Sequence, residues 1–394
     1  NVSFINTVNA ADAGGGIGLW LEIQGQVVGD YKLAFNNCCF KNTHWNGNNP
    51  NKDVSYGGGA ISVEYSKLRN YHISISYCSF YNTKSNEIHG GAIAVISSKS
   101  ISISDCYIES CSVLGNFDND GGAIYANQIG AKYDFDVFNV TINGSISDSL
   151  ITGLFFTTAK GGKYSLRSCN FINCNKINPQ HSSVVRARQN NREFECYNTK
   201  FIFDKITNTN SRGIDVYSPK FKFNDCYFRY CGRSDLNYGG GIYYDDSQNI
   251  NYDETIEISD STFEKCFSDN TAGIRLTIYN GLPSLYNNTF IDIEAKYILA
   301  LMFEINVQFS HILLEKQRFI RCTNLQTDGG GSGIWVSNHR ADGNVYPTYI
   351  DFKECDFIEN KAPKCGGGAY GIGDSSSVRP TQINFEYCNF IGNE

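Results

Sequence analysis

Three pairs of aspartates are the residues of this chain best suited to acid–base chemistry. Enzymes that cleave polysaccharides need carboxyl groups that converge on one bond, often beside an arginine, lysine or histidine. The pairs are Asp118 with Asp120, Asp134 with Asp136, and Asp245 with Asp246. No acidic position recurs from one part of the chain to the next. We therefore interpret each pair as a solvated turn rather than a catalytic dyad.

The six histidines are scattered along the chain and do not gather near these aspartates. They are His44, His72, His89, His181, His311 and His339. His89 lies next to a glycine turn, where we expect a loop or stacked side chain rather than a general base. The glycine-rich runs open no strand–turn–helix unit, so the sequence predicts no nucleotide site and no cofactor.

The chain has fifteen cysteines, which could bind metal or form disulfides. Twelve of them fall in two columns of a repeat: Cys38, Cys78, Cys106, Cys169, Cys226, Cys355 and Cys388 two residues before an aromatic or aliphatic mark, and Cys111, Cys174, Cys231, Cys266 and Cys322 three residues after it. Ser, Thr, Val or Asn stands there in other copies, which indicates a position for a small buried residue. Without a Cys-x-x-Cys pair or clustered histidines, no zinc site is expected.

Some of these cysteines could form disulfides if the repeats stack. Stacked α-carbons about 4.8 Å apart fall inside the range that a disulfide spans. Cys78 with Cys106 is one possible bridge, and Cys39, Cys196 and Cys365, which lie outside both columns, are candidates for irregular bridges. We favour a mainly reduced ladder.

Two further sets of residues could meet carbohydrate. Tyrosines 227, 230, 238, 243 and 244 could stack on a sugar, although a role in the core or in a side-chain ladder is the commoner one. Asn1, Asn139, Asn143 and Asn287 each begin an Asn-x-Ser/Thr triplet, and they are glycosylation candidates if the chain is secreted.

Two short words alternate along the chain and indicate the elements that position these residues. The first is Gly-Gly-Ala-Ile at 58–61, 90–93 and 121–124, with looser copies at 14–17, 239–242 and 366–369. The second has two apolar residues, a small residue and an aromatic, as in Ile73, Ile75, Cys78 and Phe80. Its aromatic or aliphatic mark recurs about every 27 to 40 residues. Apolar residues alternate with polar ones inside each unit, which is typical of short strands joined by a bend.

Short strands that repeat in this way can bury a face only by stacking. The sequence therefore predicts an all-β fold, a parallel β-helix of about 12 to 13 coils, roughly 60 Å long. We expect a single domain over 1–394. Because the chain opens and closes inside a repeat unit, we expect it to be a segment of a longer protein that lacks its caps.

Composition narrows the choice of partners. The net charge is −7, and no basic stripe appears, so nucleic acid is not an expected partner. The most apolar stretch, 297–314, contains Glu304, Asn306, Gln308 and His311. It is too polar for a transmembrane helix, and we expect a buried coil there.

The alternation of Gly-Gly-Ala-Ile with Phe-x-x-Asn resembles the repeats of the polymorphic outer membrane proteins. Phe357-Ile-Glu-Asn360 and Phe390-Ile-Gly-Asn393 match the second word outright. The resemblance covers nearly the whole chain, although 133–215 and 270–325 lack clear glycine words. It implies a right-handed β-helix on a cell surface, often adhesive. The Asn-, Tyr-, Ile- and Lys-rich composition is more typical of a eukaryotic microbe.

These observations favour an extracellular or cell-surface rod with a structural or adhesive role and no catalytic activity. Its expected partners are other copies of itself, in a filament, or host glycans and proteins. The alternative is a carbohydrate-active β-helix enzyme, a polysaccharide lyase or hydrolase.

Overall fold

The computed structural model is built from short parallel strands, and its described residues contain no helix. The structure describes residues 2–6, 8–9, 17–20, 30–45, 58–64, 71–86, 89–96, 98–114, 121–128, 134–148, 150–158, 162–177, 182–189, 193–207, 210–218, 220–233, 239–245, 254–279, 281–297, 300–305, 310–325, 333–338, 348–363, 369–372 and 381–394. The chain divides into two compact units. Unit 1 is Asn1–Phe194, Thr199–Phe201 and Thr209–Ser211, and unit 2 is Glu195–Asn198, Ile202–Asn208 and Arg212–Glu394.

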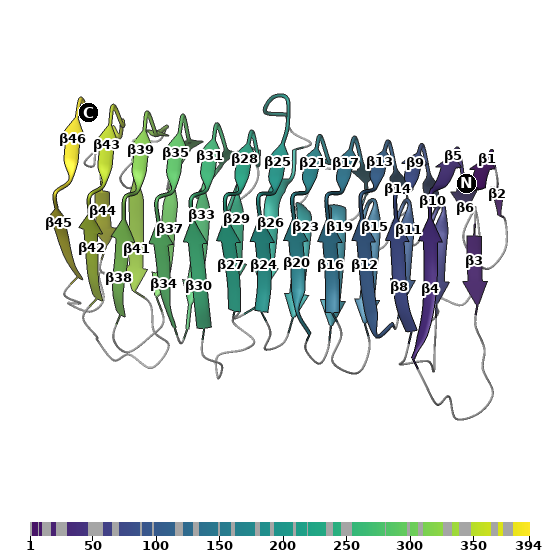
Figure 1. The fold of residues 1–394 in the computed structure, drawn as a ribbon. Helices are drawn as coiled ribbons and strands as arrows, with labels where there is room; N and C mark the ends of the chain where they lie inside the picture. The colour runs from purple at the N-terminus through teal and green to yellow at the C-terminus, as the bar shows by residue number, and fades with distance from the viewer. Residues whose placement is uncertain are drawn as a thin grey trace. The chain divides into compact units, whose positions relative to one another are not determined.

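Unit 1 winds repeatedly through four parallel sheets (Figure 1). Sheet A contains β1 (Val2–Ile5), β5 (Cys38–Lys41), β9 (Ser79–Tyr81), β13 (Tyr107–Glu109), β17 (Thr141–Asn143) and β21 (Asn170–Ile172). Sheet B contains β2 (Val8–Asn9), β6 (His44–Trp45), β10 (Lys84–Asn86), β14 (Ser112–Leu114), β18 (Ile146–Ser147) and β22 (Asn175–Lys176). Sheet C contains β3 (Ile17–Trp20), β7 (Ile61–Glu64), β11 (Ile93–Ile96), β15 (Ile124–Gln128), β19 (Ile151–Thr158) and β23 (Ser183–Gln189). Sheet D contains β4 (Tyr31–Asn36), β8 (Tyr71–Ser76), β12 (Ser100–Ser104), β16 (Asp134–Phe138) and β20 (Tyr164–Arg167).

Unit 2 repeats this path, with a shorter sheet E in the place of sheet B. Its sheet A strands are β28 (Tyr227–Arg229), β31 (Thr262–Glu264), β35 (Thr289–Ile291), β39 (Arg318–Ile320), β43 (Asp356–Ile358) and β46 (Asn389–Ile391). Sheet E contains β32 (Phe267–Ser268), β36 (Glu294–Ala295) and β40 (Thr323–Asn324). Its sheet C strands are β26 (Arg212–Tyr217), β29 (Ile242–Asp245), β33 (Ile274–Ile278), β37 (Leu301–Ile305), β41 (Ile334–Asn338) and β44 (Ala369–Ile372). Its sheet D strands are β27 (Lys220–Asn224), β30 (Glu254–Ser259), β34 (Gly281–Tyr286), β38 (Ser310–Glu315), β42 (Thr348–Lys353) and β45 (Thr381–Glu386). The division between the units falls at β24 (Glu193–Tyr197) and β25 (Lys200–Ile202).

Alternation of apolar and polar residues sets the register between coils. In β12, Ile101 and Ile103 are buried, while the three serines that alternate with them are only half-buried. Ile101 and Ile103 pair with Ile73 and Ile75 of β8, so each isoleucine lies over an isoleucine of the coil below. The parallel β-solenoid predicted from the repeats is therefore confirmed.

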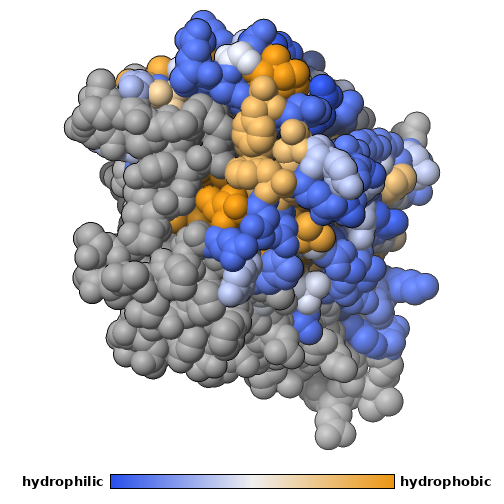
Figure 2. Space-filling view, turned by 90° about the vertical axis from the view of Figure 1, so that its left-hand side faces the viewer, coloured by the Kyte–Doolittle hydropathy of each residue, from blue (hydrophilic) through white to orange (hydrophobic). Residues whose placement is uncertain are grey.

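The marks of the second sequence word form a ladder of rings inside sheet A. In unit 2, consecutive rings from Phe228 to Phe390 stack with centroids 4.7–5.1 Å apart. Figure 2 views unit 2 from the side of β45 and β46, where Phe385, Phe390 and Ile391 are 43–56% exposed. Apolar side chains (orange) there lie between hydrophilic ones (blue).

The glycine word forms the turn into sheet C. Gly90 has φ 74°, which favours glycine over residues with a side chain. A β-carbon on Gly91 would lie 2.4 Å from the carbonyl oxygen of Gly122 in the next coil. The glycine word therefore combines a positive φ at its first residue with a close approach between coils at its second.

Two further corners turn the chain from sheet D to sheet A and then out of sheet A. Residues with positive φ make both corners, as Tyr77 (53°) and Asn82 (49°) do around β9. We call the second of these the exit corner. The exit corner determines on which side of the coil the side chains of the two following residues lie. No helix that could cross a membrane occurs in the described part of the chain.

Candidate functional site

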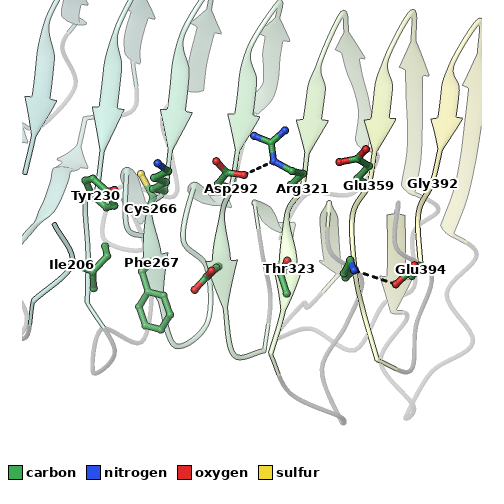
Figure 3. A pocket seen from close by; sticks show the side chains of 13 residues that line it. Ile206, Tyr230, Cys266, Phe267, Asp292, Arg321, Thr323, Glu359, Gly392 and Glu394 are labelled. Atoms are coloured by element: carbon green, nitrogen blue, oxygen red, sulfur yellow. Dashed lines mark hydrogen bonds and ion pairs between the residues drawn. The ribbon is translucent and has the colours of Figure 1, made fainter. Parts of the chain in front are cut away.

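A groove of about 860 Å³ lies along the exit corners of unit 2 (Figure 3). Two rows of side chains line it. The corner row is Tyr230, Lys265, Asp292, Arg321, Glu359 and Gly392. The outer row is Ile206, Phe267, Glu294, Thr323, Lys361 and Glu394. The buried Cys266 also contributes to the lining.

The backbone of each of five coils places one residue in each row, whereas Tyr230 and Ile206 come from two different coils. At the corner, Arg321 has φ 50° and lies on the groove side. The next residue, Cys322, is fully buried, and Thr323 then begins β40 and returns to the groove. The same corner–buried–outer order occurs at 265–267, 292–294 and 359–361. Adjacent coils are one strand spacing apart, so the six corner residues span about 24 Å.

Charges of opposite sign alternate along the corner row. Arg321 Nε donates to Asp292 Oδ1 at 2.7 Å, and Lys361 Nζ lies 3.3 Å from Glu394 Oε2 in the outer row. The hydrogen bond to Asp292 is the largest effect that raises the pKa of the Arg321 guanidinium above its usual range, and the negative charge of Glu359 adds to it. Arg321 and Lys361 are half or more exposed, so these pairs stay open to solvent.

The exit corner does not require these charges, because unit 1 builds the same corner without them. Its corner residues are Asn6, Asn42, Asn82, Ser110, Gly144 and Asn173, all with φ between 48° and 65°. Asn42 Nδ2 donates to Asn6 Oδ1 and Asn82 Nδ2 to Asn42 Oδ1, both at 2.9 Å. Asparagine and glycine tolerate this backbone conformation better than lysine, arginine or glutamate. Unit 2 therefore carries less favourable residues along its groove.

The described aspartates of the three pairs do not line this groove, and Asp134 and Asp136 lie in strand β16 (Asp134–Phe138) rather than in the turn that was expected. Asp118, Asp120 and Asp246 lie outside the described residues. Asp136 pairs with Arg167 at 2.7 Å, and Asp134 accepts a hydrogen bond from the Lys163 amide at 3.0 Å. Asp245 accepts one from the Tyr243 hydroxyl at 3.2 Å. Each described carboxylate thus has a local partner of its own.

The four described tyrosines that could have stacked on a sugar do not form one shared surface. Tyr244 is fully buried, Tyr243 lies beneath the guanidinium of Arg212, and Tyr227 bonds to Glu264. Tyr230 lines the groove, and Tyr238 lies outside the described residues. His89 stacks on Tyr125 with ring centroids 3.8 Å apart, which confirms the expected stacking role.

The cysteine columns face the interior. Cys111, Cys174 and Cys322 are fully buried, and burial raises the pKa of each thiol to about 12. No disulfide joins any two of the fourteen described cysteines, which include Cys39, Cys78, Cys106 and Cys196, whereas Cys365 lies outside the described residues. Cys196 Sγ is 3.6 Å from Cys226 Sγ. Disulfide formation at these positions stays a prediction.

Two of the glycosylation candidates already use the amide nitrogen that a glycan would modify. Asn139 Nδ2 donates to Asp105 and Asn287 Nδ2 to Asp260, each at 2.8 Å. Asn143 is half-buried in β17, and Asn1 lies outside the described residues. Glycosylation of the four residues stays a prediction.

A serine, a histidine and an aspartate meet on the outer face of sheet D in unit 1, where sequence reasoning had not connected them. His72 Nδ1 lies 2.7 Å from Ser100 Oγ, beside a cavity of about 650 Å³. Asp30, however, is 3.8 Å from His72 Nε2, and both its oxygens accept hydrogen bonds from Lys99 at 2.8 and 2.9 Å. These bonds are the main cause of the lowered pKa of Asp30. A nucleophilic triad needs the carboxylate to orient the histidine, and here it pairs with lysine instead.

The sequence carries a signal for the groove. Except for Ile206, the residues of its two rows lie immediately before or after the second cysteine column, as Lys265 and Phe267 flank Cys266. In the described part of the chain, no three His, Cys, Asp or Glu side chains gather closely enough to hold a metal ion. Comparisons of the chain with family models, curated proteins and solved structures find no match.

Proposed function

We propose that the chain is part of an extracellular or cell-surface β-solenoid that adheres to an extended polymer, without catalysis, through the groove of unit 2. The observation that carries this proposal is the makeup of the corner row. Tyr230, Lys265, Arg321 and Glu359 all have φ between 50° and 53°, although unit 1 fills the equivalent corners with asparagine, serine and glycine. Strained residues that persist at one site are a reason to look for function there.

Strain at a corner is not sufficient evidence by itself. The other corner of unit 2 also holds charged residues, Lys316 and Glu354, with φ 55° and a separation of 4.0 Å. What distinguishes the exit corner is that its side chains line a continuous groove, together with an outer row. A groove that presents similar chemistry once per coil suits a partner that is itself repetitive and extended.

The test compares two sets of charge-removing substitutions. Lys265→Asn, Arg321→Asn and Glu359→Asn would be combined in a groove variant, and Lys316→Asn with Glu354→Asn would form the matched control at the other corner. Binding to immobilised neutral polysaccharides, polyanionic polysaccharides and gelatin would be measured. We expect wild type and control to bind one class of polymer and the groove variant to lose most of that binding. Equal binding by both variants, or no binding by any protein, would overturn the proposal.

A carbohydrate-active enzyme is the second candidate, favoured by the carboxylates Glu294 and Glu359 in the groove. It requires release of reducing ends or unsaturated products from a polysaccharide, lost on Glu359→Gln or Glu294→Gln. We expect no product from the wild-type protein, since the carboxylates of Asp292 and Glu394 are held in ion pairs and Glu359 lies next to Arg321 in the corner row.

A further inference from the structure

We infer that the polymer bound by the groove of unit 2 is a neutral, hydroxyl-rich polysaccharide, with about one sugar facing each coil. This inference rests on the proposed function of the groove. It names the ligand class that the lining residues fit.

Positive and negative side chains are nearly balanced along the groove. The lining holds three cationic side chains and four carboxylates, and opposite charges alternate along the corner row. Polyanion recognition needs a run of cations that replaces counterions. Here Asp292 and Glu359 flank Arg321, so an acidic polysaccharide would meet a carboxylate on both sides of that guanidinium. A polycation would be repelled by Lys265 and Arg321, which lie on either side of Asp292 in the corner row.

Neutral sugars suit such a surface. A hydroxyl group can donate to a carboxylate and accept from a guanidinium or an ammonium group. Successive hydroxyls along a glycan could therefore use acceptors and donors that alternate from coil to coil. The open ion pair of Arg321 with Asp292 offers both within 2.7 Å of each other.

The backbone hydrogen bonds along the groove exclude an extended peptide as the ligand. Peptides that extend a sheet bind through free backbone groups at its edge. The backbone amides along this groove are already used between coils: Asp292 N donates to Ile320 O, Arg321 N to Ile358 O, and Thr323 N to Ile293 O, all at 2.8–3.0 Å. The groove therefore offers side chains and no free strand edge along these coils.

The spacing of the coils and the apolar side chains at one end of the groove also suit a glycan chain. Adjacent coils are about 4.8 Å apart, close to the length of one hexose in a β-linked chain. At one end of the groove Tyr230 and Phe267 are half-buried and Ile206 is 37% exposed, so apolar surface adjoins the charged rows (Figure 3). The ring faces of sugars carry C–H groups that pack on such side chains, as aromatic rings do at other interfaces.

The experiment is calorimetric titration of the whole chain with neutral β-linked gluco- and manno-oligosaccharides of two to six sugars, with heparin and alginate oligosaccharides alongside. We expect affinity to rise with each added sugar, by about tenfold or more from two to six, and to change little between low and high salt. Phe267→Ala should weaken binding about fivefold. The matched control is Tyr349→Ala, which removes a 39%-exposed aromatic from sheet D.

The possible results distinguish a wrong ligand class from a wrong binding site and from a wrong function. If heparin, alginate or gelatin binds and the groove variant abolishes that binding, the ligand class is wrong and the adhesive function stands. If neutral oligosaccharides bind equally to wild type, Phe267→Ala and the groove variant, the site is wrong. If no polymer binds, both proposals fail.

Discussion

At the scale of single residues, the corner positions of unit 2 hold charged side chains that line the groove but are unfavourable for the backbone conformation there. Lys265 has φ 51°, and its nearest ionic partner, Glu264, is 3.8 Å away at the surface. An exposed pair at that distance contributes little to stability. The backbone conformation costs an L-residue about 1 kcal/mol, and asparagine reduces this cost.

We therefore predict that Lys265→Asn raises the free energy of unfolding by about 1 kcal/mol while it weakens polymer binding. Urea unfolding followed by circular dichroism would measure the first effect. The reverse change, Asn82→Lys in unit 1, serves as the control. It should destabilise, because it also removes the hydrogen bond from Asn82 to Asn42. A loss of stability on Lys265→Asn would show that the corner lysine is there for folding.

Because several thiols are buried, the free energy of unfolding should fall at alkaline pH. Burial raises the pKa of Cys111 and of Cys174 to about 12 in the folded chain, from the 9.0 of a solvated thiol. Because the folded pKa is raised, the stabilisation is complete below pH 9 and is lost as pH rises towards 12. Each thiol should lower the free energy of unfolding by about 1.4 kcal/mol per pH unit across that window.

We predict that replacing Cys111 and Cys174 with serine makes the fall in stability between pH 9 and 10.5 shallower. Ser145 occupies the same column, so serine is a native substitute there. The measurement is urea unfolding at several pH values. Lysine titration contributes equally to both proteins and cancels in the comparison. Identical slopes would mean that these thiols titrate normally when folded.

At the scale of elements, the turn into sheet C depends on glycine because coils approach one another there. We predict that Gly91→Ala costs about 3 kcal/mol or more, since its β-carbon would lie 2.4 Å from a carbonyl oxygen and 2.8 Å from the Ser112 amide nitrogen. Gly144→Asn is the matched control. It lies at an exit corner with φ 65°, where asparagine occupies other coils, and should be close to neutral. Thermal unfolding would rank the two variants.

The strands and turns could be predicted from the sequence, but the groove was not. Alternation around Ile73 and Ile75, the recurring phenylalanines and the paired glycines were sufficient to predict strands, stacking and turns. The groove escaped prediction because Lys265, Asp292 and Arg321 share no residue type, and they looked like solvated surface. Their relation arises from a backbone feature, positive φ at one corner of every coil, that non-glycine residues do not reveal in sequence. The residues on either side of the second cysteine column were the available signal.

At the scale of the whole molecule, each coil contacts mainly the coils before and after it. A unit should therefore tolerate the deletion of one complete coil, provided that the register of the remaining strands is kept. Tyr77 and Asp105 are equivalent corner residues with φ 53° and 52°, and Ser76 pairs with Ser104. Deleting 77–104 joins Ser76 to Asp105 and keeps the order of corners and sheets. We predict a folded protein with unchanged β-sheet signal per residue and unchanged binding through unit 2.

Deletion of 77–103 is the informative control for this prediction. It leaves one extra residue before the corner, and a shift of one residue in a strand moves every side chain to the opposite face. Ile73 and Ile75 would then exchange places with serines, and unit 1 should fail to fold. If both deletions unfold the protein, stability depends on contacts beyond neighbouring coils. If both fold, the register of unit 1 is not fixed by its buried isoleucines.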